Sequence, residues 1–225
     1  MPPAPPASGF RFISDASLSA FTRPMREHLG EDSRFDVVAT GGIVLVSAQA
    51  AAGTSHPDGT PPNSATKVLL LQRAAHDSMP LHWEIPGGAV DEEDESILHG
   101  LAREIWEESG LLVTRVVRVV GAGQTFTSSK GKRVIKYSFE VEVERPAGGD
   151  LPRVTIDPEE HADYAWASVE ECRGHRLDAS GAGIGGTAAL NFTSPDQEQV
   201  ILEGFRLHQD KQPLLTEALG SMAWE

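Results

Sequence analysis

Apolar and polar positions follow two different periods along this chain, and together they predict both strands and helices. Nearly continuous apolar, β-branched runs at 35–47 and 67–73 predict buried strands. Residues 113–126 and 133–145 alternate and predict a strand pair joined by the glycine-containing turn TSSKGKR. We also expect short strands at 154–156 and 164–167, a helix at 18–29 that Pro24 disturbs, and a helix at 194–209.

The most informative pattern lies at residues 87–112, which read GGAVDEEDESILHGLAREIWEESGLL. At about 100° per residue, the apolar positions of this segment cover one continuous arc that should face a core. Ser96 is suited to the start of a helix and Gly110 to its end. We therefore predict an amphipathic helix between them, with an apolar face formed by Ile97, Leu98, Leu101, Ala102 and Ile105.

The same helix carries three carboxylates, Glu104, Glu107 and Glu108, at a spacing that places them on one side. They lie at the edge of the apolar arc, where an unpaired charge is costly to bury. Carboxylates this close repel one another unless a cation lies between them, and such hard oxygen ligands suit Mg²⁺ or Mn²⁺ better than zinc. Arg103 can brace this group, or it can form only a surface ion pair with Glu107.

Composition narrows the classes of partner. The 225-residue chain has a formal net charge of −14, which argues against a nucleic acid polymer and against an anionic membrane surface. Cys172 is the single cysteine, so the chain forms no internal disulfide. No signal peptide or membrane span is evident in the sequence. We expect a cytoplasmic protein, and the sequence leaves a nuclear location open.

The run REIWEESGL at 103–111 resembles the signature of the Nudix hydrolases, and so does the preceding stretch WEIPGG. The seven residues between Glu95 and Arg103 match the family's spacing, whereas six residues instead of five separate Gly88 from Glu95. This resemblance implies an α/β/α sandwich with a mixed β-sheet. Periodicity alone supports only an α/β or α+β class.

The resemblance also implies roles for the residues of this motif, the Nudix box. Glu104, Glu107 and Glu108 should hold divalent metal ions, with the backbone carbonyl of Gly88 as a further ligand. Glu104 should act as, or orient, the base that activates water, and Arg103 should brace its carboxylate.

Two further candidates lie outside the box. Glu160, in the acidic loop DPEEHADYAW, is our candidate for an additional metal ligand or base, and the alternative is an exposed loop acid. Arg73 ends a predicted strand and is a candidate for substrate binding, with a surface arginine as the alternative. We expect His161 to be an ordinary loop residue.

We expect the chain to contain one Nudix hydrolase domain at 35–212. A flexible tail at 1–9 and a helical extension at 10–34 should precede it, and a second tail at 213–225 should follow. Residues 48–66 and 174–193 should form loops that shape a pocket or a dimer contact, and we leave open whether two copies associate. The glycine pattern at 181–186 lacks the preceding strand that a dinucleotide site needs.

The leading functional hypothesis is a Mg²⁺-dependent hydrolase that splits a nucleoside diphosphate derivative, NDP-X, into NMP and P-X. The alternative is a catalytically silent Nudix-fold module that only binds a nucleotide. An enzyme similar to isopentenyl-diphosphate isomerase is disfavoured, because Cys172 lies outside any matching motif. The sequence does not identify the substrate.

Overall fold

The computed structural model of this chain describes residues 6–7, 9–47, 66–178 and 188–210. Several predicted segments therefore lie outside the described residues. These are most of the 1–9 tail, the 48–66 insertion except for residue 66, the middle of the 174–193 loop with its glycine pattern, and the 213–225 tail.

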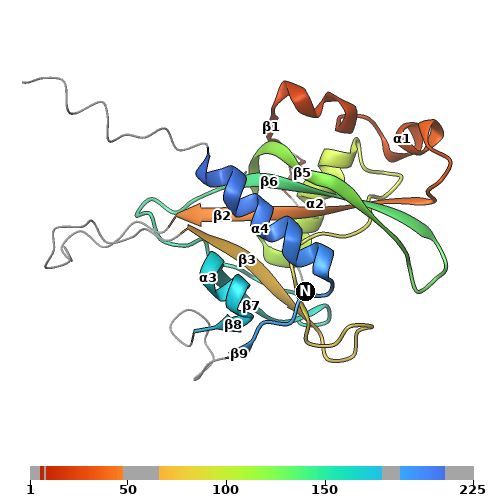
Figure 1. Cartoon of the computed structure of the whole chain (residues 1–225). Helices are drawn as coiled ribbons and strands as arrows, with labels where there is room; N and C mark the ends of the chain where they lie inside the picture. Colours follow the sequence, from red (N-terminus) through yellow and green to blue (C-terminus); the bar gives the residue numbers. More distant parts are fainter. Residues whose placement is uncertain (1–5, 8, 48–65, 179–187, 211–225) are drawn as a thin grey trace, which may run out of the picture.

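The described chain contains both helices and strands (Figure 1). In order they are β1 (Ile13–Ser14), the 3-10 helix η1 (Ala16–Phe21), α1 (Met25–Glu31), β2 (Val37–Ser47), β3 (Thr66–Arg73), β4 (Trp83–Glu84), α2 (Ile97–Ser109), β5 (Val113–Thr127), β6 (Arg133–Val143), β7 (His161–Ser168), α3 (Val169–Gly174), β8 (Arg176–Leu177), β9 (Ala188–Ala189) and α4 (Pro195–Gln209).

Seven of the described strands form one mixed sheet, in the order β1-β5-β6-β2-β3-β4, with β7 also paired to β3. The pairs β1–β5 and β2–β6 are parallel, whereas the other pairs in this sheet are antiparallel. Strands β8 and β9 form a separate antiparallel pair. The mixed sheet confirms that part of the fold prediction.

Helices α2 and α4 cover opposite faces of this sheet (Figure 1). Successive residues of β2 point to opposite faces, and a Cβ added at Gly42 would lie 2.4 Å from Ile105 of α2. On the other face, a Cβ added at Gly204 of α4 would lie 2.9 Å from Ile43. Both helices therefore approach the sheet so closely that only glycine fits at these contacts. This arrangement confirms the expected α/β/α layers.

The predicted hairpin is also confirmed. Strands β5 and β6 pair along most of their length, but the register shifts between Val120 and Gln124. Gly121 and Gly123 in this interruption have φ values of +73° and +90°, which favour glycine. Beyond this bend the hairpin continues past the other strands (Figure 1). It therefore forms a wall beside the sheet.

Two predictions differ from the structure. The helix expected at 18–29 is divided into η1 and α1, because Pro24 lacks an N–H and stands as the N-cap of α1. The strand expected at 154–156 is wrong. Here the N–H of Thr155 donates to the carbonyl of Ser109 at the end of α2 (2.8 Å), so the segment completes a helix end instead of joining the sheet.

Sequence reasoning did not predict β1 or α3. The short α3 begins with a capping box, in which Ser168 and Glu171 bond each other's backbone N–H groups. None of the described helices has the length and apolar character that crossing a membrane would require.

Candidate active site

The predicted box helix is confirmed as α2. The Ser96 side chain caps its start, and Gly110 ends it in the left-handed conformation. Glu108, near the end of α2, is buried, and its Oε2 accepts a hydrogen bond from the N–H of Gly87 at 2.6 Å. A Cβ added at Gly88 would lie 2.5 Å from Oε2 of Glu104. The Gly87–Gly88 turn therefore lies directly against the carboxylates of α2.

Arg103 holds several of these acids in place. Its Nη1 donates to Glu104 Oε1 at 2.8 Å and to Glu107 Oε2 at 2.9 Å. Its Nε and Nη2 donate to the two carboxylate oxygens of Asp94, and Nη2 also donates to the carbonyl of Ala89. Burial lowers the pKa of Arg103, but the bonds to Asp94 and the charge of Glu104 outweigh it and hold that pKa above its usual value. These contacts extend well beyond a surface ion pair with Glu107.

The acid that hydrogen-bonds to Arg103 from before the helix is Asp94, and Asp91 adds an ion pair at 3.3 Å. Glu95, whose spacing to Arg103 matches the family's, has a side chain that is 83% exposed and lies near His99. Ser96 has the extended backbone of an N-cap, and Asp94 lies in the turn before it, where its Oδ2 accepts from the N–H of Asp91. The signal for Asp94 was present in the sequence, because the family's five residues separate it from Gly88.

The carboxylates of this site lack sufficient compensating charge. Burial, with the charges of Glu107 and Asp91, raises the pKa of Glu104 to about 7 despite Arg103. Burial also raises the pKa of Glu108 well above its usual value, and the charges of Glu104 and Glu84 add to this effect. A divalent cation among these groups would offset their repulsion, so the donor set fits such an ion.

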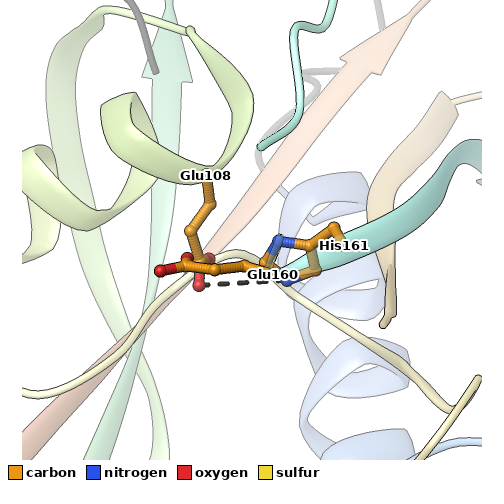
Figure 2. A group of neighbouring side chains, drawn as sticks. All are labelled: Glu108, Glu160 and His161. Atoms are coloured by element: carbon orange, nitrogen blue, oxygen red, sulfur yellow. Dashed lines mark ion pairs between the residues drawn. The ribbon is translucent and has the colours of Figure 1, made fainter. Parts of the chain in front are cut away.

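Glu160 and His161 reach the same place from the start of β7 (Figure 2). Glu108, Glu160 and His161 each offer a ligand atom, and these atoms all lie within 4.8 Å of one another. The structure thus brings the predicted Glu160 next to the box, although its side chain is exposed. Burial, followed by the charge of Asp157, raises the pKa of Glu160.

The expectation that His161 is an ordinary loop residue is wrong. It is the first residue of β7, it pairs with Arg73 of β3, and it is 3% exposed. Its Nε2 lies 3.9 Å from Glu108 Oε1, and its Nδ1 has no hydrogen-bond partner among the described residues. Burial lowers the pKa of His161 and favours a neutral imidazole, which can act as a metal ligand or a hydrogen-bond acceptor.

The other two predicted residues are tied into the surrounding structure. The carbonyl of Gly88 accepts a hydrogen bond from the N–H of Thr40 at 2.8 Å, which fixes the turn to β2. Arg73 is partly buried, and its guanidinium donates to Glu84 and to Asp77, each at 2.5 Å. The structure thus places Arg73 near the acids, within two ion pairs.

A cavity of about 490 Å³ lies near the acids, although neither the carboxylates of α2 nor Glu160 line it. Its walls come from the end of β3, from β4, from the β5–β6 hairpin and from the start of α4. Glu84 and Lys136 line it, and the charges of both act on Glu108. Cation-binding carboxylates beside a polar cavity are suited to a phosphorylated ligand.

Comparisons with known proteins identify the family of this chain. Residues 61–183, more than half of the chain, match the NUDIX domain, and the chain belongs to this family. A protein named RNA pyrophosphohydrolase from Psychrobacter sp. (strain PRwf-1) is 33% identical over 75 residues, which cover 33% of this chain and 40% of that protein. The chain thus spans about 40% of the length of this curated relative.

Two solved structures align with most of this chain. The NUDIX domain of Shewanella oneidensis NrtR, solved in complex with ADP ribose, aligns with a TM-score of 0.51 and 17% identity, over 82% of this chain and 97% of that chain. A C. elegans Ap4A hydrolase aligns with a TM-score of 0.49 and 17% identity, over 78% of this chain and 98% of that chain. At this identity the likeness to the NrtR domain shows the fold alone.

Proposed function

We propose that this protein hydrolyses the diphosphate linkage of a nucleoside diphosphate derivative, NDP-X, to NMP and P-X, and that it requires Mg²⁺ or Mn²⁺. The observation that supports this proposal is a group of carboxylates on α2 that are buried near a polar cavity. Nearby positive charges do not balance their negative charges. Such a group is costly to maintain in a fold unless it binds a cation.

The residues that would hold the metal are Glu104, Glu107, Glu108 and Glu160, with the carbonyl of Gly88 as a further ligand. Oxygen donors of this kind suit Mg²⁺ and Mn²⁺. When bound, the ion would neutralise phosphate oxygens and favour attack by water. His161 offers a nitrogen to the same group, which favours Mn²⁺ as an effective substitute.

Glu104 is our candidate for the general base. Its ionised carboxylate can take a proton from the attacking water. Arg103 binds Oε1 and fixes the orientation of this carboxylate. In the step we propose, the water oxygen bonds to phosphorus as the bridging P–O bond breaks. The water's proton passes to Glu104, and the bridging oxygen leaves with the departing phosphate.

Lys136 and Arg73 are our candidates for contact with the substrate. Both line the cavity. The charge of Lys136 acts on Glu108, and the charge of Arg73 acts on His161. Their positive charges would face the phosphates of a bound diphosphate. Because Glu84 and Asp77 hold the guanidinium of Arg73, we expect it to position the substrate without large movement.

The direct test is hydrolysis of a panel of NDP-sugars and dinucleoside polyphosphates with Mg²⁺, monitored by phosphate release or chromatography. We expect Glu108→Gln to reduce turnover at least about a hundredfold, because it removes a carboxylate that would bind the metal. Glu95→Gln is the matched control, since Glu95 also belongs to the acidic segment but is 83% exposed, and it should retain activity within about twofold.

The outcomes separate the two functions. The hydrolase proposal fails if the panel is not cleaved, or if Glu108→Gln and Glu95→Gln have equal activity. Nucleotide binding without metal and without turnover would instead support the catalytically silent module.

A further inference from the structure

One wall of the 490 Å³ cavity carries an exposed aromatic ring. Phe126, in the β5–β6 hairpin, is 49% exposed and lines the cavity. Gln124 lies two residues before it and so points to the same face of β5. Gln124 also pairs directly with Lys136 of β6, whose charge acts on Glu108. Phe126, Gln124 and Lys136 therefore lie along one wall of the cavity, and Lys136 is the member of this wall whose charge reaches the proposed reaction site.

The start of α4 forms another wall of this cavity, and it carries a buried amide without a partner. Gln197, in the first turn of α4, is 2% exposed, and its Nε2 makes no hydrogen bond to any described residue. Its backbone N–H is already satisfied by the capping Ser194. A buried N–H group is normally paired. This nitrogen has almost no accessible surface, so it can donate to a ligand in the cavity once the Gln197 side chain turns toward it.

The charges around this part of the cavity disfavour a second anionic group. Asp196 lies beside Gln197 at the start of α4 and lines the cavity, and Glu84 lines it as well. A neutral planar group with acceptor atoms on its edge would satisfy Gln197, stack on Phe126 and avoid repulsion by these carboxylates. Nucleobases have all of these properties.

We propose that this part of the cavity binds the nucleobase of the substrate, with the base stacked on Phe126 and an edge acceptor bonded to the Gln197 amide, whose side chain turns toward the base when it binds. The assignment rests on the proposed function, since it takes the diphosphate to lie at the carboxylates of α2. The phosphates then pass Lys136, and the base reaches the hairpin wall.

Binding of two non-hydrolysable probes tests this subsite. Adenosine α,β-methylene diphosphate carries a base, and methylenediphosphonate is its base-free counterpart. Titration calorimetry with Mg²⁺ should show that Phe126→Ala weakens the adenosine probe about tenfold and changes the base-free probe less than twofold. Ile13→Ala is the control for loss of an exposed apolar side chain, since Ile13 is 65% exposed on β1, and it should affect neither probe.

Two further variants examine each contact by itself. Phe126→Trp should retain affinity for the adenosine probe, and its indole fluorescence should be quenched by the stacked base. Gln197→Met removes the amide donors at similar size, so it should change the ratio of affinities for adenosine, guanosine and cytidine probes severalfold while Tm stays close to that of the wild type.

The subsite is refuted if Phe126→Ala binds both probes as the wild type does, if it weakens both equally, or if the wild type binds no adenosine probe. Failure of the hydrolase proposal gives a different result. In that case Phe126 still controls binding of the base, but no diphosphate compound is cleaved.

Discussion

Replacing Glu104 by glutamine should make the metal-free protein more stable at alkaline pH. The pKa of Glu104 is raised from 4.5 to about 7, mainly by burial. Its ionised form is therefore disfavoured in the folded state, and the stability that the protonated group provides is lost as pH rises through 7. One pKa unit corresponds to about 1.4 kcal/mol, so at pH 8 the carboxylate makes the fold about 3 kcal/mol less stable than at pH 4.

Glutamine has nearly the same shape and stays neutral. Its side-chain carbonyl can still accept the bond that Arg103 now donates to Glu104 Oε1. Glutamine should therefore recover most of the ~3 kcal/mol, so that the free energy of unfolding of Glu104→Gln exceeds that of the wild type by about 2 kcal/mol at pH 8. This corresponds to a rise in Tm of roughly 4–8 °C for a domain of this size. At pH 4 both side chains are neutral, and the gain should vanish.

Urea unfolding after EDTA treatment, measured by circular dichroism from pH 4 to pH 8.5, follows this difference. The gap between variant and wild type should open between pH 4.5 and 7 and remain constant above. Adding Mg²⁺ at pH 8 should stabilise the wild type and reduce the gap. Glu95→Gln, on an exposed side chain, should follow the wild-type curve. The reasoning is refuted if Glu104→Gln is the less stable protein at pH 8, or if the gap does not depend on pH.

Three other substitutions test the surrounding structure. Asp94→Asn should lower turnover at least tenfold by loosening Arg103, as steady-state kinetics would show, and activity within twofold of wild type would contradict this role. Gly42→Val should cost roughly 1–3 kcal/mol in urea unfolding, since its Cβ meets Ile105, and no loss would contradict the close packing of α2. Ser96→Ala should cost about 1 kcal/mol by loss of the N-cap, and unchanged stability would show that the cap is unimportant.

The local parts of the fold could be predicted from the sequence. The apolar arc of the box helix, its cap at Ser96 and its end at Gly110 depend on neighbours within one or two turns, and α2 has these bounds. The long β5–β6 hairpin could also be predicted, because the alternation of apolar and polar residues and the turn between the strands are local features. For the same reason the position of Glu108 at the edge of the core was predicted, and it is buried.

The parts that were missed depend on long-range contacts. His161 enters the site because β7 pairs with β3, and nothing in its immediate neighbourhood in the sequence indicates this burial. The hydrogen bonds from Arg103 to Asp94 were not predicted, because they depend on the backbone turn before Ser96. The segment 154–156 has the residues of a strand, but the N–H of Thr155 donates to the carbonyl of Ser109 at the end of α2. Gln197 acquires its significance only from the cavity that it lines.

Binding of Mn²⁺, observed by electron paramagnetic resonance, tests the central claim most directly. Free Mn²⁺ gives a sharp signal that decreases when the ion binds to protein. We predict that the wild type removes this signal at micromolar to submillimolar concentrations, and that Glu108→Gln does so at least tenfold less well, while Glu95→Gln matches the wild type. If the wild-type protein leaves the signal of millimolar Mn²⁺ unchanged, the carboxylates of α2 do not form a metal site and the proposed chemistry is wrong.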